Sequence, residues 1–280
     1  MKALDGRIAV VTGAASGIGR ALAARFLDAG MRVVMADVEA NALERAAKAL
    51  GGGPDVLAVP TDVTRAGAVE QLAERALDAF GAVHVVCNNA GVFTGGLVWE
   101  APHEDWEWVL GVNLWGVIHG IRTFVPILMQ QDEGHVVNTA SMAGVTATPL
   151  SGVYNVSKHA VVALSETLYL DLQGKGAKVG VSCVCPEAVN TAIARAERNR
   201  PEEHRIAETD LTPERAAVGQ AITAALERGI DPDVIADRTL RAILEDRFWV
   251  LADDPYWRGV CETRLDGIRH RRNPSFGGRS

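Results

Sequence analysis

The stretch TGAASGIG, residues 12–19, decides the fold, because it joins an apolar run to a helical one through three glycines. Residues 7–11 before it have the pattern of a strand, and residues 18–29 that of a helix which Gly30 would cap. Glycines in a strand-to-helix turn let the backbone approach a pyrophosphate, whose charge is met by free N–H groups and the helix dipole. The spacing, G-x-x-x-G-x-G, is a variant of the dinucleotide fingerprint. The residues expected to bind the dinucleotide here are Gly13, Ser16, Gly17, Ile18 and Gly19.

Short β-branched runs alternate with helical stretches along the rest of the chain. The strand candidates are residues 7–11, 32–36, 56–59, 83–87, 135–139, 179–184 and 248–251. Most are continuous apolar runs, as expected for strands that are covered on both faces. Helical character marks residues 18–29, 41–50, 65–80 and 104–130. This β-α-β order predicts an α/β fold with right-handed crossovers and a parallel sheet between two layers of helices.

Asp37 stands at the end of the second strand candidate, 18 residues past Gly19. An acidic residue at this place accepts hydrogen bonds from the adenosine ribose hydroxyls, and its charge repels a 2′-phosphate. The neighbours that might compensate such a phosphate, Ala15 and Val38, are not basic. The sequence therefore predicts NAD rather than NADP as the cofactor.

The motif YNVSK, residues 154–158, places Tyr154 and Lys158 on one face of a helix, because they are four residues apart. A free tyrosine has a pKa of about 10, so acid–base work near neutrality requires a nearby positive charge. Lowering that pKa by about three units takes roughly 4 kcal/mol, which we expect Lys158 and an oxidised nicotinamide ring to supply together. Tyr154 is thus the candidate general acid and base of a hydride-transfer reaction.

Several motifs in register resemble the short-chain dehydrogenase/reductase family, in its compact single-domain branch. They are TGAASGIG, NNAG at residues 88–91, Asn113, Ser141 and YNVSK, and the similarity covers about residues 5–195. The resemblance implies a Rossmann-like, doubly wound, mainly parallel seven-stranded sheet in the order 3-2-1-4-5-6-7. It also implies an oxidoreductase that interconverts an alcohol and its ketone.

The resemblance further implies a role for each catalytic candidate. Ser141 would polarise the substrate oxygen, Tyr154 would give or take the hydroxyl proton, and Lys158 would lower the tyrosine pKa and hold the nicotinamide ribose. Asn113 would anchor a water that links Lys158 to solvent as a proton relay. The remaining cofactor contacts that the family implies are Asp62, Val63, Asn89, Ala90, Gly91, Pro186, Val189 and Thr191.

Glu187 departs from the family pattern, because it follows Pro186 where the family usually has a glycine. A glycine at such a position permits an unusual φ or a close approach to the cofactor. The glutamate therefore changes the local backbone or sets a carboxylate near the nicotinamide or the substrate. A side chain turned to solvent is the alternative.

Apolar residues are expected around the reacting carbon: Val92, Phe93, Met142, Ala143, Val145 and Leu150. They favour a hydrophobic or alicyclic secondary alcohol or its ketone, in contact with Ser141, Phe93, Ala143 and Tyr154. An NADP-type ketone or 3-oxoacyl reductase is a second hypothesis, and Asp37 counts against it. A nucleotide-sensing relative without turnover is a third, and the intact catalytic set argues against it.

The chain is expected to form one domain over residues 1–280, because no linker or repeat divides its 280 residues. Residues 190–231 are charged and irregular, which is typical of a lid or substrate loop, and residues 248–280 are expected to form the last strand and a tail. Residues 104–130 are apolar nearly all round. They and the helix that carries Tyr154 are similar to helices that members of the family pair across a subunit interface, which implies a homodimer or homotetramer.

The composition indicates which kinds of partner are not expected. The net charge of −7 counts against a nucleic acid, and the basic residues 269–272 are expected to be a solvated end. No apolar stretch of about 18 residues is free of a charge, Gly or Pro, so no membrane span is expected. With no signal sequence at the N-terminus, we expect a cytoplasmic protein. Cys183 and Cys185 would share one face of a strand, but the four cysteines lack the spacing of a zinc site, and no metal is expected.

Overall fold

The centre of the molecule is a seven-stranded sheet with the order β3-β2-β1-β4-β5-β6-β7, which confirms the predicted order. A computed structural model describes residues 1, 3–206 and 212–276. The strands are β1 (Ile8–Thr12), β2 (Arg32–Asp37), β3 (Val56–Pro60), β4 (Val85–Asn88), β5 (Gly134–Thr139), β6 (Val179–Cys185) and β7 (Trp249–Leu251). All of their pairings are parallel, so the carboxyl ends of the strands lie along one edge.

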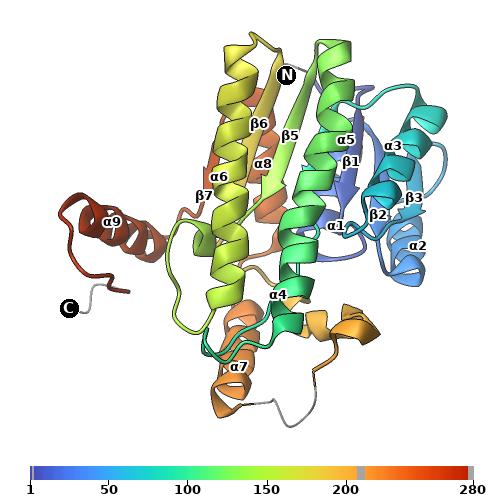
Figure 1. Ribbon diagram of the computed structural model, residues 1–280. Helices are drawn as coiled ribbons and strands as arrows, with labels where there is room; N and C mark the ends of the chain where they lie inside the picture. The colour runs from blue at the N-terminus through green and yellow to red at the C-terminus, as the bar shows by residue number, and fades with distance from the viewer. Residues whose placement is uncertain (2, 207–211, 277–280) are drawn as a thin grey trace.

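Helices cover both faces of this sheet, as the β-α-β order predicts (Figure 1). One face carries α1 (Gly17–Asp28), α2 (Ala40–Ala49) and α8 (Pro232–Glu245). The other carries α3 (Ala66–Phe80), α4 (His103–Leu110), α5 (Gly116–Gln131) and α6 (Gly152–Gly174). A separate apolar cluster fills each interface, with Phe26 and Leu43 on the first face and Leu72 and Phe124 on the second. Each such side chain stabilises the fold by about 1.5–3 kcal/mol when it is fully buried.

The first crossover shows how the sequence sets the ends of a helix. Leu22 and Phe26 recur every four residues on α1 and are fully buried against the sheet. Gly30 follows with a φ of +77°, and the N–H of Met31 donates to the carbonyl of Phe26 at 3.0 Å. This 6→1 hydrogen bond is the Schellman ending that the glycine predicts, and it turns the chain directly into β2.

The helix predicted over residues 104–130 contains a π-helical turn. This turn, Gly111–Trp115, separates α4 from α5 and carries Asn113. A π turn holds one more residue than an α turn, and such turns are frequent at functional sites. By length and composition the whole segment His103–Gln131 could cross a membrane. Helices that cover a sheet pass the same test, and this one packs on β4 and β5.

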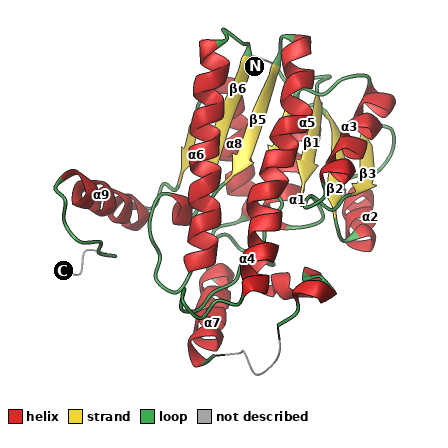
Figure 2. Cartoon of the chain, in the orientation of Figure 1, coloured by secondary structure: helices red, strands yellow, loops and turns green. Residues whose placement is uncertain are grey.

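The segment expected to be a lid folds over the carboxyl ends of the strands (Figure 2). It forms two short 3₁₀ segments, Ile193–Asn199 and Glu202–His204, and then α7 (Pro213–Glu227). Residues 207–211 of this segment, and residues 277–280 of the predicted tail, lie outside the described residues. After β7 the chain forms α9 (Pro255–Arg269), which projects away from the sheet (Figure 1).

The cysteines are all free thiols. Cys183 and Cys185 face the same side of β6, as predicted, with their sulfur atoms 3.9 Å apart. Burial raises the pKa of the Cys87 thiol far above its usual range, so this thiol stays protonated. Among the described residues, no group of three or more His, Cys, Asp or Glu side chains has the arrangement of a metal site.

Candidate active site

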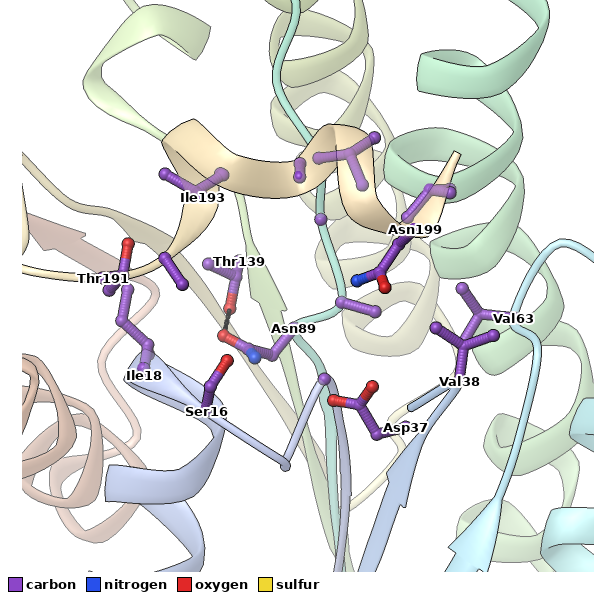
Figure 3. Close-up of a pocket in the computed structure, with 18 of the residues that line it drawn as sticks. Ser16, Ile18, Asp37, Val38, Val63, Asn89, Thr139, Thr191, Ile193 and Asn199 are labelled. Carbon is purple, nitrogen blue, oxygen red and sulfur yellow. Dashed lines mark hydrogen bonds between the residues drawn. The ribbon is translucent and has the colours of Figure 1, made fainter. Parts of the chain in front are cut away.

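A cavity of about 260 Å³ opens where the strands β1, β2, β4, β5 and β6 end. Polar side chains such as Asp37 and Asn89 and apolar ones such as Val38 surround it, and Ile193 and Asn199 reach it from the covering segment (Figure 3). Most of the residues predicted to bind cofactor or substrate line this one cavity. They are Gly13, Ser16, Gly17, Ile18, Asp37, Asp62, Val63, Asn89, Ala90, Gly91, Ser141, Tyr154, Lys158, Pro186, Val189 and Thr191.

The glycine turn forms a cradle that larger side chains would fill. Gly13 has a φ of +67° and Gly17 a φ of +53°, both in the left-handed region that favours glycine. A Cβ on Gly13 would lie 2.9 Å from the Cα of Ala90, and one on Gly17 would lie 2.9 Å from Thr191. Because α1 begins at this turn, its first N–H groups have no partner within the helix and suit an anion. The turn therefore fits the pyrophosphate of a dinucleotide.

Gly19 supports this cradle from behind and does not line the cavity. A Cβ there would lie 2.2 Å from the carbonyl oxygen of Gly13, so only glycine lets α1 begin this close to β1. On the other side Asn89 donates from Nδ2 to the carbonyl of Thr12 at 3.0 Å, and accepts from Thr139 at 3.2 Å (Figure 3). Asn89 thus joins the ends of β1, β4 and β5.

Asp37 faces the cavity and also holds the glycine turn. Its Oδ2 accepts the N–H of Ala15 at 3.0 Å, and its Oδ1 accepts the N–H of Glu39 at 3.0 Å. Val38 and Val63 lie beside it at the same end of the cavity (Figure 3). This end therefore combines a carboxylate with apolar side chains, which fits the ribose and the base of an adenosine.

The opposite end of the cavity holds the predicted catalytic residues. Tyr154 and Lys158 lie on one face of α6, with Lys158 Nζ 5.6 Å from the centre of the tyrosine ring. Nζ donates to the carbonyl oxygen of Thr139 at 2.8 Å, which fixes the buried ammonium against β5. Ser141 follows β5, and its hydroxyl lies beside the phenol of Tyr154. The structure therefore brings a hydroxyl, a phenol and an ammonium group together at one point.

Burial changes the acidity of both ionisable groups. It raises the pKa of Tyr154 to about 12, although the hydrogen bond from Ser141 acts in the opposite direction. It lowers the pKa of Lys158 to about 8. For Tyr154 the cost of burying the phenolate is the largest cause and outweighs the hydrogen bond from Ser141. The lower pKa predicted for Tyr154 with Lys158 and an oxidised nicotinamide ring stays a prediction.

Asn113 lies behind the cavity and does not line it. Its Oδ1 accepts the N–H of Val92 at 2.8 Å, and its Nδ2 donates to the carbonyl of Val92 and to Ser157 Oγ, both at 3.0 Å. Gly91 lies between Asn113 and Lys158, since a Cβ there would be 3.4 Å from Oδ1 and 3.5 Å from Nζ. The amide side chain therefore clamps the segment after β4 to the helix that carries Tyr154.

Of the apolar residues predicted around the reacting carbon, only Val92 lines the cavity, and the others lie outside its lining, namely Phe93, Met142, Ala143, Val145 and Leu150. Phe93 packs edge-on against the ring of Tyr154, with 5.1 Å between ring centres. Ala143 is buried behind Ser141 and donates its N–H to Ser141 Oγ at 3.1 Å. Apolar residues that sequence reasoning missed line the cavity instead, namely Trp108, Val112, Ala196 and Leu226. The first two sit on the long apolar helix, where nothing in the local pattern distinguishes them.

Glu187 is neither solvated nor free. Its carboxylate is 7% exposed and accepts hydrogen bonds from Nη1 of Arg238 at 3.1 and 3.2 Å. Arg238 also pairs with Asp253 at 3.0 Å. The φ of Glu187 lies outside the left-handed region, so the backbone does not need glycine here. The glutamate lines the cavity but directs its charge into α8.

The covering segment is held by ion pairs that the sequence did not indicate. Asp105 on α4 is 1% exposed and pairs with Arg200 at 2.6 Å and with Arg215 on α7. The guanidinium of Arg200 stacks 4.1 Å from the ring centre of Trp108. On the other side of the cavity, Arg198 pairs with Glu39 at 2.6 Å. Charged side chains thus tie this segment to both sides of the cavity.

Known proteins resemble this chain over nearly its whole length. The sequence matches the short chain dehydrogenase family over residues 7–202. A short-chain dehydrogenase/reductase from Burkholderia phymatum, solved in complex with NAD, is 45% identical, with a TM-score of 0.95 and 98% of each chain covered. The 1-deoxy-11-beta-hydroxypentalenate dehydrogenase of Streptomyces exfoliatus is 39% identical over 272 residues, which is 92% of this chain and 90% of that protein. A CLA biosynthesis dehydrogenase/reductase of Lactiplantibacillus plantarum is 32% identical over 272 residues, 96% and 95% of the two chains.

Proposed function

Since the chain belongs to the short-chain dehydrogenase/reductase family and is an oxidoreductase with a nicotinamide nucleotide cofactor, we propose that it interconverts a hydrophobic or alicyclic secondary alcohol and its ketone with NAD. One observation carries this proposal. Ser141, Tyr154 and Lys158 meet at one end of a cavity whose other end holds the glycine turn and Asp37.

In this proposal the two ends of the cavity bind different parts of the dinucleotide. The turn around Gly13 and Gly17 would hold the pyrophosphate, Asp37 the adenosine ribose, and Lys158 the nicotinamide ribose. A bound nicotinamide supplies a ring carbon that accepts a hydride in oxidation and gives it back in reduction. The carboxylate of Asp37 supports NAD over NADP, because it would repel a 2′-phosphate.

Tyr154 and Lys158 act as one titrating pair in this proposal. Burial lowers the pKa of Lys158 to about 8 and raises that of Tyr154 to about 12, so the pair loses its first proton near pH 8. The proton that remains resides either on the phenol or on the amine, and the two forms carry the same net charge. In the form with a tyrosinate and an ammonium, the phenolate accepts the hydroxyl proton of the alcohol while Ser141 holds the substrate oxygen.

Asn113 is a positioning residue here. It clamps Val92 and Ser157, and Ser157 in turn donates to the carbonyl of Tyr154 at 2.8 Å. These hydrogen bonds fix the position of the turn of α6 that carries Tyr154. The water relay assigned to this residue by the family resemblance remains part of the proposal.

An apolar substrate suits the side chains near Tyr154. Val92, Trp108 and Val112 line the cavity, and Phe93 packs on the tyrosine ring. A relative from Streptomyces exfoliatus is named for the dehydrogenation of a hydroxypentalenate. Both observations support a secondary alcohol carried on an apolar skeleton.

A panel of alicyclic, terpenoid, steroid and aromatic alcohols, scored by NAD reduction, tests the proposal. We expect turnover with at least one apolar secondary alcohol. Tyr154→Phe should then lower kcat by about a thousandfold, as loss of a general acid–base does. NAD affinity, measured by fluorescence titration, should stay nearly unchanged.

Other results of the same panel would favour the alternatives. Turnover of small charged polyols alone would contradict the apolar substrate. Faster turnover with NADP would favour a ketone or 3-oxoacyl reductase. NAD binding without any turnover would favour a nucleotide-sensing protein.

We also propose a homodimer or homotetramer, formed through the outer surface of α5 and α6. Trp115 is 52% exposed and Leu170 is 66% exposed on this surface, although both are apolar. Sedimentation at micromolar concentration should give twice or four times the chain mass of 29.8 kDa. A monomer mass would contradict this part of the proposal.

A further inference from the structure

We propose that Glu39 and Arg198 form a second selector for NAD, in addition to Asp37. In this inference Glu39 neutralises a guanidinium that would otherwise attract the 2′-phosphate of NADP. It rests on the proposed function, because it concerns how the same cavity distinguishes two nicotinamide dinucleotides.

The first step is the position of the pair. Glu39 stands two residues after Asp37, and the N–H of Glu39 donates to Asp37 Oδ1. Its own Oε1 accepts from Arg198 Nη2 at 2.6 Å and from Asn199 Nδ2 at 2.9 Å. All four residues line the cavity, and Asn199 points from the covering segment toward Asp37 and Val38 (Figure 3). The pair therefore crosses the cavity at the end where Asp37 lies.

The second step is the charge at this end. Among the described residues that line it, Asp37, Glu39 and Asp62 are carboxylates, and Arg198 is the one cation. Burial acts to raise the pKa of Glu39, but hydrogen bonds from Arg198 and Asn199 outweigh it and lower the pKa below its usual 4.5. Glu39 is thus ionised at neutral pH, and its charge cancels that of Arg198. Arg45, which also acts on Glu39, does not line the cavity. Among the described residues that line this end, a 2′-phosphate therefore meets no unpaired cation.

The third step is that Arg198 does not depend on Glu39 for its position. Its Nη1 donates to the carbonyl of Arg195 at 2.7 Å, in its own short helix, and to that of Ala192 at 3.3 Å, just before this helix. Removal of the Glu39 charge therefore leaves the guanidinium in place and frees its positive charge. Arginine binds phosphate well, because its planar fork matches the oxygens.

The test compares the dissociation constants of NAD and NADP, measured by quenching of tryptophan fluorescence, without any substrate. Glu39→Gln keeps the size of the side chain and removes its charge. We expect it to improve the affinity for NADP relative to NAD by about tenfold, the size of one charge-assisted hydrogen bond. The ratio of the two constants is the readout, because any loosening of the covering segment affects both dinucleotides.

Two further variants make the test specific. Arg198→Met added to Glu39→Gln should return the ratio to that of the original chain, since it removes the one cation among the described residues that line this end. Glu133→Gln is the matched control, because it breaks an ion pair of similar exposure, that of Glu133 with Arg7 at 2.9 Å, in which each side chain is 36% exposed. The two residues directly precede β5 and β1, at the edge of the sheet opposite the cavity. Glu133→Gln should leave the ratio unchanged.

The outcomes separate this inference from the proposed function. If the original chain binds NAD better than NADP and Glu39→Gln does not change the ratio, the selector is wrong and the NAD assignment stands. If the double variant gains as much affinity for NADP relative to NAD as Glu39→Gln alone, the role of Arg198 is wrong. If the original chain binds neither dinucleotide, or prefers NADP, the proposed function and the selector both fail.

Discussion

The floor and the cover of the cavity are built from different interactions. The floor consists of strand ends and the glycine turn, held by amide and hydroxyl hydrogen bonds such as those of Thr12 and Asn89. The cover, residues 190–206 and 212–227, is held by ion pairs that reach Asp105 and Glu39. The shape of the floor is therefore independent of pH and salt near neutrality, whereas the position of the cover depends on charge.

The two ion pairs of the cover also differ from each other. Asp105 and Arg200 are 1% and 3% exposed, so each would be costly to leave unpaired. Glu39 and Arg198 are 30% and 39% exposed, so solvent screens their attraction. We infer that the cover is anchored firmly at α4, through Asp105, and loosely at the adenosine end.

The largest effect that tests this comparison is expected for Asp105→Asn. The variant removes the buried carboxylate that pairs with both Arg200 and Arg215 and leaves them only the more exposed Glu197, so it should lower the free energy of unfolding by about 3 kcal/mol. Chemical denaturation measures this value. Asp132→Asn is the control, because it breaks an exposed pair with Lys178 and should cost under about 1 kcal/mol. Equal losses in the two variants would mean that the cover is not anchored at Asp105.

A second test concerns the pH profile at the floor of the cavity. Since the burial of Lys158 and Tyr154 sets their acidity, alcohol oxidation should rise about tenfold per pH unit below pH 8 and level off above it. Reduction should fall through the same range. The inflection should not move when ionic strength is raised, because burial rather than a screened surface charge produces it. An inflection that shifts with salt would place its origin in the exposed pairs of the cover.

The same pair has a consequence for stability. Burial lowers the pKa of Lys158 in the folded chain to about 8, below its ordinary 10.5. Between these two values the Lys158 side chain binds more protons in the unfolded chain than in the folded one, so Lys158 itself contributes a rise of the free energy of unfolding with pH. The buried thiols, whose pKa values are raised, contribute in the opposite direction. Lys158→Met should remove the contribution of Lys158 alone, so the change in the free energy of unfolding from pH 8 to pH 10 should be less positive in the variant than in the original chain, as equilibrium denaturation would detect.

The smallest effect is expected for Glu187→Gly, which restores the residue usual in the family. Arg238 keeps its second partner, Asp253, so the loss of stability should be about 1 kcal/mol. The KM for NAD should change by no more than about twofold, because the carboxylate of Glu187 is directed into α8 and not toward the cavity. A tenfold change in KM would show that Glu187 acts on the cofactor after all.

The floor of the cavity could be predicted from the sequence, whereas the bonds that hold the cover could not. The strands and the residues at their carboxyl ends follow from local patterns, because a glycine turn or a β-branched run carries its structure within a few residues. The strand order follows from the resemblance to the family. The partners Glu39 and Arg198 are 159 residues apart, and Asp105 and Arg200 are 95 apart. No local pattern connects them, so the bonds of the cover became visible only in the fold.

The acidity of Tyr154 could not be predicted for a related reason. The spacing of Tyr154 and Lys158 predicts that they share a helix face, but not how deeply both are buried. Because desolvation depends on every element packed around the pair, its direction required the structure. The same holds for Glu187, whose partner Arg238 comes from α8.

The π-helical turn at Gly111–Trp115 has a consequence for the tolerance of this chain to changes in length. One additional residue in a helix rotates everything beyond it by about 100°. The turn thereby lets α4 present Trp108 to the cavity while α5 presents Phe124 and Leu128 to the sheet. A deletion of one residue within residues 111–115 would restore a regular helix. It would rotate α5 relative to α4, so that Trp108 could no longer face the cavity while Phe124 and Leu128 face the sheet. Most substitutions on the surface of this turn should be tolerated, whereas a single deletion should abolish the geometry around Asn113.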